Sequence, residues 1–213
     1  MKKLIAACAA LLAFAAFAAA GVASASPVLT DPHGTLPVGA KIEATNTGST
    51  KMTTSLGTIE CSNATLTGTV VKNNGTEIEG TIENAAFNSA GGPCTTAFLG
   101  NVTVTPKKLH WCIKAGGKLA ADTFELKSGN CGGALGIMEF TLDTAIAGEC
   151  TYTKTAVIGT FTTGVGGDLT VSEQEFVKSA GGFFCPGSGK LDMTFDLYTD
   201  GKEHTPTYQV HVG

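Results

Sequence analysis

The clearest strand pattern in the chain is KLDMTFDLYT, residues 190–199. Every second residue in it is apolar, and the residues between them are polar or aromatic. The apolar set is Leu191, Met193, Phe195 and Leu197. A period of two predicts a β-strand that covers a core with one face and meets solvent with the other.

Further strand and turn signals recur along the rest of the chain. Asn73-Asn74-Gly75 predicts a hairpin between strands at 66–71 and 78–82, and Asp200-Gly201 predicts a turn before a strand at 208–212. Ser172–Glu175 has the shape of a helix-capping box, but no helical stripe follows it. Shorter strands are expected at 41–44, 102–105, 123–127, 137–142 and 156–162. The predicted class is all-β, an antiparallel β-sandwich or barrel.

Two parts of the chain resemble each other. Glu60-Cys61 and Glu149-Cys150 open matching stretches that end at Cys94 and Cys185, with an offset of 89 to 91 residues. We therefore expect two duplicated strand-rich halves, at about 51–106 and 140–200. Segment 107–139 lies between them. A chance match in a chain rich in Gly, Thr and Ala is the alternative.

The first 25 residues have the pattern of a secretory signal peptide. Lys2 and Lys3 precede an uncharged apolar run at 4–22, and Ala23-Ser24-Ala25 offers a cleavage site. A membrane span and a lipid-attachment box at Cys8 are the alternatives. After cleavage we expect no membrane span, an N-terminal arm with the first strand at 26–50 and a β-domain at 51–213. The predicted location is secreted or extracellular, with envelope association left open.

Six cysteines remain after residue 25, and an even number in an exported chain predicts three disulfides. Metal binding is disfavoured because no Cys-x2-Cys pair occurs. If the halves are duplicated, cysteines at equivalent places pair most simply within each half. The predicted pairs are Cys61–Cys94, Cys150–Cys185 and, in the middle segment, Cys112–Cys131; pairing between the halves is the alternative.

The charge pattern argues against polyanion binding. The net charge is −4, and all 14 basic residues are lysine. Arginine supplies the planar fork that recognises phosphate and guanine, so we expect no nucleic-acid partner.

No motif for catalysis or cofactor binding stands out. His110 and Trp111 are weak surface-site candidates, expected as a partly exposed pair beside Cys112. The carboxylate pairs Glu173 with Glu175 and Asp192 with Asp196 are expected to be solvated strand faces. No cofactor or metal is predicted.

Three short motifs carry a resemblance to a known family. Leu109-His110-Trp111, Cys150-Thr151-Tyr152 and Cys185-Pro186 resemble motifs of exported, disulfide-containing, β-rich proteins common in actinobacteria. Members of that family often have Leu-Pro-Trp where this chain has Leu-His-Trp. The resemblance implies a secreted β-rich fold and brings no established activity.

The expected function is that of an exported, non-enzymatic β-protein with a binding, cell-envelope or extracellular structural role. Its partner is expected to be an extracellular or envelope ligand of unknown identity. The alternative is a secreted hydrolase that acts on extracellular polymer.

Overall fold

A computed structural model describes residues 27–89, 92–163, 167–199, 202, 204–205, 207 and 209–213. The expected signal peptide and the Asp200-Gly201 turn lie outside these residues. Every helix or strand that the structure assigns in them is a strand, so the all-β prediction is confirmed. No helix in this part of the chain is long and apolar enough to span a membrane.

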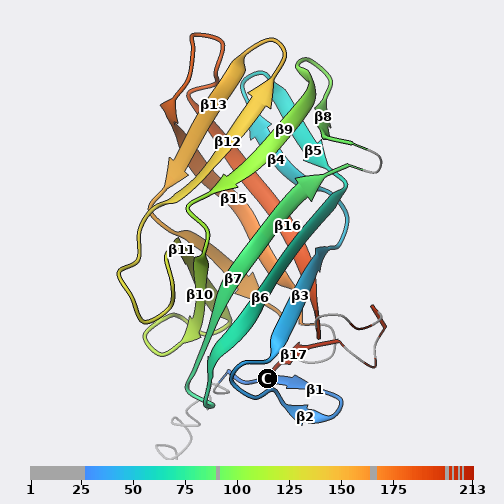
Figure 1. Ribbon diagram of the computed structural model, residues 1–213, viewed down its shortest axis with the longest axis vertical. Helices are drawn as coiled ribbons and strands as arrows, with labels where there is room; N and C mark the ends of the chain where they lie inside the picture. The colour runs from blue at the N-terminus through green and yellow to red at the C-terminus, as the bar shows by residue number, and fades with distance from the viewer. Residues whose placement is uncertain are drawn as a thin grey trace, which may run out of the picture.

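Most of the strands belong to one antiparallel sheet that closes into a ring of 14 (Figure 1). Its strands are β3 (Lys41–Asn46), β4 (Thr50–Thr54), β5 (Gly57–Cys61), β6 (Asn63–Asn73), β7 (Glu77–Asn88), β8 (Cys94–Thr96), β9 (Gly100–Lys107), β10 (Trp111–Gly116), β11 (Thr123–Ser128), β12 (Met138–Thr144), β13 (Gly148–Lys154), β14 (Val157–Phe161), β15 (Leu169–Ala180) and β16 (Ser188–Thr199).

An additional pairing between β15 and β16 divides the ring into two circuits. The upper circuit runs β15-β13-β12-β9-β8-β5-β4-β16, and the lower one runs β16-β3-β6-β7-β10-β11-β14-β15. This division is possible because both shared strands are 12 residues long. The first part of β16 pairs with β4 and its second part with β3. The two circuits are therefore stacked along the long axis of the molecule (Figure 1).

The alternation in residues 190–199 is confirmed by β16. Met193, Phe195 and Leu197 are buried in the core, and Leu191 packs against it. The predicted hairpin at Asn73-Asn74-Gly75 is also present, as β6 and β7. A local sequence pattern was enough to predict β16 and the β6–β7 hairpin, because alternation and turn chemistry depend on residues that are neighbours in the chain.

The capping-box segment forms a bulge in β15. The pairing of β15 with β16 shifts register between Val171 and Gln174, and Glu173 has a φ of 47°. Asp192 on β16 holds the bulge, because its Oδ1 accepts hydrogen bonds from the Glu173 N–H (2.8 Å) and the Ser172 hydroxyl (3.3 Å). The Asp192 carboxylate on the neighbouring strand thus accepts hydrogen bonds from donors that the bulge removes from the regular pairing.

A small second sheet lies at the lower end of the ring. It contains β1 (Leu29–Asp31), β2 (Gly34–Thr35) and β17 (His211–Val212), in the order β17-β1-β2. Of the described residues in the segment predicted as a strand at 208–212, His211 and Val212 form β17, and the N-terminal arm contains β1 and β2.

The two halves predicted from the sequence do not form separate structural units. Strands β4, β5, β8 and β9 of the first predicted half lie in the upper circuit, whereas β6 and β7 of the same half lie in the lower one. The structure does not show a duplication, which stays a prediction from the sequence.

Candidate functional site

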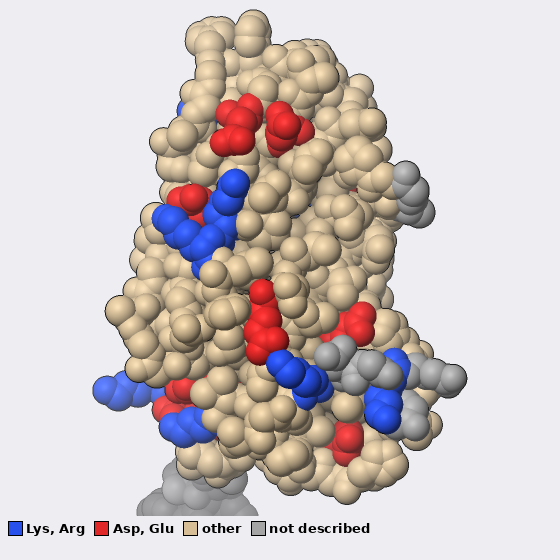
Figure 2. Space-filling model, viewed as in Figure 1, with Lys and Arg blue, Asp and Glu red and all other residues tan. Residues whose placement is uncertain are grey.

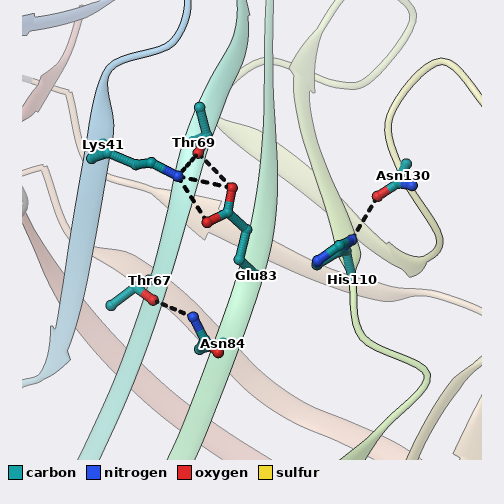
Figure 3. A network of polar contacts seen from close by, with 7 residues as sticks. All are labelled: Lys41, Thr67, Thr69, Glu83, Asn84, His110 and Asn130. Atoms are coloured by element: carbon teal, nitrogen blue, oxygen red, sulfur yellow. Dashed lines mark hydrogen bonds and ion pairs between the residues drawn. The ribbon is translucent and has the colours of Figure 1, made fainter.

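The two surface-site candidates from the sequence lie in different environments. His110 is exposed, and its Nδ1 lies 2.9 Å from Oδ1 of Asn130 (Figure 3). Trp111 is only 4% exposed, and its Nε1–H donates to the carbonyl of Lys107 (3.0 Å). The expectation of a partly exposed pair is therefore wrong for Trp111, because strand alternation at the start of β10 turns the indole into the core.

A polar network covers the outer wall beside His110. Glu83 on β7 accepts hydrogen bonds from Lys41 Nζ (2.8 and 3.0 Å) and the Thr69 hydroxyl (2.7 Å) (Figure 3). These donors, the Lys41 ammonium first, lower the pKa of Glu83 below its usual value. A carboxylate held in its charged form is a poor proton donor, so this network serves cross-strand pairing better than acid–base chemistry.

A carboxyl pair that sequence reasoning missed lies near the β15–β16 pairing. The Asp168 side chain is hydrogen-bonded to that of Asp196, and this contact, with burial and charge repulsion, raises the pKa of Asp168 to about 6. The Tyr198 hydroxyl donates to Asp196 (3.3 Å), and the Tyr198 ring stacks on His204 with centroids 4.5 Å apart. Two carboxyls that share a proton can act as an acid–base pair.

The carboxylate pairs considered from the sequence do not form joint sites of this kind. Glu173 lies 3.6 Å from Lys190 Nζ, and Asp192 accepts the hydrogen bonds of the β15 bulge. In the described part of the chain, no three His, Cys, Asp or Glu side chains are grouped so that they could hold a metal ion.

All three predicted disulfides are present: Cys61–Cys94, Cys112–Cys131 and Cys150–Cys185. Cys61–Cys94 ties β5 to β8, and Cys150–Cys185 ties β13 to the loop before β16. Cys112–Cys131 fastens the loop after β11 to β10. Three disulfides are typical of a protein that works in an oxidising, extracellular environment.

The interior of the lower circuit contains a chamber of about 90 Å³. Residues on many of its strands contribute to the wall, together with Leu29 and Val212 of the small sheet. None of the lining residues is ionisable. The lining residues are Leu29, Ile42, Ala44, Leu66, Thr67, Gly68, Thr69, Val70, Ile78, Gly80, Thr81, Ile82, Ile113, Ala115, Phe124, Phe161, Leu169, Leu197 and Val212.

A second chamber, the upper chamber, has a volume of about 60 Å³ and is lined mainly by the upper circuit, with Trp111, Leu126 and Val157 among the residues contributed by the lower one. Its walls are rich in Met and aromatic side chains, and Glu139 also contributes to them. The hydroxyl of Thr50 lies in this wall, is buried and has no hydrogen-bond partner in the protein. The upper chamber is thus smaller than the lower one and, unlike it, has an ionisable residue in its wall.

No family model matches the chain, and no similar curated protein or solved structure is found. The site must therefore be interpreted from its own chemistry.

The small sheet closes the lower chamber at one end. Asn73, the last residue of β6, fixes it with three hydrogen bonds: Oδ1 accepts from the Leu29 N–H (2.8 Å), and Nδ2 donates to the carbonyls of Leu29 (2.8 Å) and Leu36 (2.9 Å). Leu29 and Val212 also lie in the chamber wall. The same small sheet therefore provides part of the chamber lining and part of its closure.

Proposed function

We propose that the protein is an exported, non-enzymatic binding protein that holds a small, neutral, apolar ligand in the lower chamber. The observation that carries the proposal is an unfilled interior of about 90 Å³ whose lining contains no ionisable side chain. Protein interiors are close-packed, so a void of this size is uncommon. An apolar chamber enclosed by strands is a common place for a ligand.

The volume limits the ligand. Apolar cavities of about 150 Å³ stay dry and take up benzene or xenon. A chamber of about 90 Å³ suits a molecule of a few carbon atoms or the end of a longer alkyl chain.

The lining also limits the ligand's charge. A carboxylate or ammonium group buried there would lose its water without gaining an ionic partner. A neutral alcohol or hydrocarbon is therefore the expected class.

We expect 1-hexanol to bind at least about ten-fold more tightly than hexanoate, because burying the carboxylate costs more than burying the hydroxyl. Titrations followed by NMR shifts of the methyl groups that line the chamber measure both affinities. Ala115→Leu fills part of the chamber and is expected to abolish hexanol binding. Ala120→Leu, the same change at an exposed position, is the control and should leave binding unchanged.

Two results would overturn the proposal. One is the absence of binding by 1-hexanol and a panel of similar neutral probes, while Ala115→Leu raises the melting temperature; the chamber would then be a packing defect. The other is tight hexanoate binding that Ala115→Leu does not affect.

Export and family membership belong to the same proposal. The three disulfides and the N-terminal pattern support secretion, and the resemblance to the actinobacterial exported proteins is consistent with it.

A secreted hydrolase is the second candidate, and the Asp168–Asp196 pair is the observation in its favour. A carboxyl with a pKa of about 6 is suited to general acid catalysis. Neither residue lines either chamber. Assays of wild type and Asp196→Asn against polysaccharides and peptides test this candidate, which requires a wild-type activity that the variant loses.

A further inference from the structure

The upper end of the ring is built from four loops that contain no charged residue. They join β4 to β5 (55–56), β8 to β9 (97–99), β12 to β13 (145–147) and β15 to β16 (181–187). All four lie at the same end because the paired strands run alternately toward it and away from it. In Figure 1 these loops form the top of the molecule, and in Figure 2 the extreme top of the visible face has no Lys, Asp or Glu side chain, with two acidic patches below it.

Large apolar side chains project from three of these loops. Phe183 is 95% exposed, Phe98 62%, Phe184 61% and Ile146 54%. We call these four residues the apolar rim. Among the described residues every exposed Phe belongs to it, whereas residues such as Phe124, Phe176 and Phe195 are buried in the core.

The loop that carries Phe183 and Phe184 is anchored to the strands beneath it. The Cys150–Cys185 disulfide ties it to β13, and the buried Tyr152 hydroxyl donates to the carbonyl of Pro186 (3.0 Å). Lys178 Nζ donates to the carbonyls of Gly182 (3.4 Å) and Cys185 (3.3 Å). These anchors hold the backbone of the loop while its two aromatic rings stay in solvent. Exposure of this kind marks an interaction surface.

We propose that the apolar rim inserts into the interfacial region of a lipid bilayer. The rim consists of side chains that protrude from separate loops, so a fluid apolar medium can surround each of them. With 150–250 Å² on each aromatic side chain, the four expose about 500 Å² in all. A stable dimer buries about 800 Å² on each partner. The rim is therefore too small for a self-association interface, whereas Phe and Ile side chains can be buried at the boundary between the lipid headgroups and the acyl chains.

The charges nearest the rim define how binding depends on lipid type. Asp143, Glu149, Lys178 and Lys190 lie within three residues of the loops, and two of the four are acidic while two are basic. Such a set gives no basic patch that would attract anionic headgroups. Insertion should therefore depend on the apolar side chains and change little with salt. This inference does not depend on a ligand in the lower chamber.

Flotation of the protein without residues 1–25 with phosphatidylcholine vesicles tests the proposal. We expect Phe183→Ser combined with Phe184→Ser to lower the vesicle partition coefficient at least about ten-fold, because two apolar anchors are lost. Val38→Ser is the matched control, since Val38 is 67% exposed but lies in the loop before β3, away from the rim. It should leave partitioning within about two-fold of wild type.

A second measurement places the rim in the bilayer. Phe183→Trp should give a blue-shifted emission component with vesicles and be quenched by brominated lipids, while the native Trp111 is buried in the core in either case. Three results would overturn the proposal: no flotation of wild type, flotation that requires anionic lipid, or a dimer in solution that the double Ser variant dissociates.

Discussion

At the scale of single residues, the most informative group is the Asp168 carboxyl. Its hydrogen bond to Asp196 raises its pKa from 3.8 to about 6, so the folded state binds a proton more tightly than the unfolded state does. The resulting stabilisation is fully present below about pH 4 and is lost as the pH rises to about 6. Above that pH, the Asp168 and Asp196 carboxylates carry like charges close to each other.

Replacement of this carboxyl should therefore matter only at higher pH. Asp168→Asn is expected to raise the free energy of unfolding by about 1 kcal/mol at pH 7.5, and much less at pH 4.5, because the amide cannot ionise. Urea unfolding at the two pH values measures the difference. Asp143→Asn on the exposed surface is the control, and an equal effect of Asp168→Asn at both pH values would contradict the shared proton.

At the scale of elements, one side chain fastens β1 of the small sheet to β6. Asn73 makes three hydrogen bonds to the backbone of residues 29–36, and the Val210 N–H beside β17 donates to the carbonyl of Leu197 on β16. Because β1 and β17 are only three and two residues long, their own ladder adds little. The closure of the chamber is therefore less stable than its walls.

Asn73→Ala should open this end locally. Loss of three partly buried hydrogen bonds is expected to lower the opening free energy by about 2 kcal/mol, which accelerates amide exchange of Leu29 and Leu36 about 30-fold. Hydrogen exchange followed by NMR measures this, with β12 amides as the internal reference. Asn84→Ala, which removes a single exposed bond to Thr67, is the matched control. Equal acceleration throughout the chain would indicate global rather than local destabilisation.

At the scale of the whole molecule, the disulfides distribute stability over the two circuits. Cys61–Cys94 and Cys150–Cys185 join elements of the upper circuit across segments of 33 and 35 residues, and Cys112–Cys131 joins β10 of the lower circuit to the loop after β11 across 19 residues. In the loop-closure model each crosslink restricts the unfolded chain, and longer segments gain more.

Removal of each pair by double Ser substitution should follow this order. We expect a loss of about 4 kcal/mol for Cys150–Cys185 and about 0.5 kcal/mol less for Cys112–Cys131. Denaturant unfolding of the oxidised variants provides the values. A much larger loss for the shorter pair would show that native-state contacts, rather than chain entropy, dominate.

Much of the local architecture could be predicted from short patterns. Alternation predicted β16, Asn73-Asn74-Gly75 predicted the β6–β7 hairpin, and the repeated placement of the cysteines predicted the three disulfides that form. The Asp168–Asp196 pair could not be predicted from a short pattern. Asp168 and Asp196 are 28 positions apart, and only the pairing of β15 with β16 brings them together.

The strand class and the absence of an arginine-based recognition surface follow from the sequence alone, because they depend on composition and period, whereas the cysteine pairing was predicted only through the expected duplication. Only the tertiary structure decided that β15 and β16 serve two circuits, that Trp111 is buried, that a neutral chamber remains inside and that four uncharged loops meet at one end. The physical reason is that strand pairing joins residues far apart in the chain. Backbone hydrogen bonds hold the strands together almost independently of side-chain identity, so few local signals record which strands are neighbours.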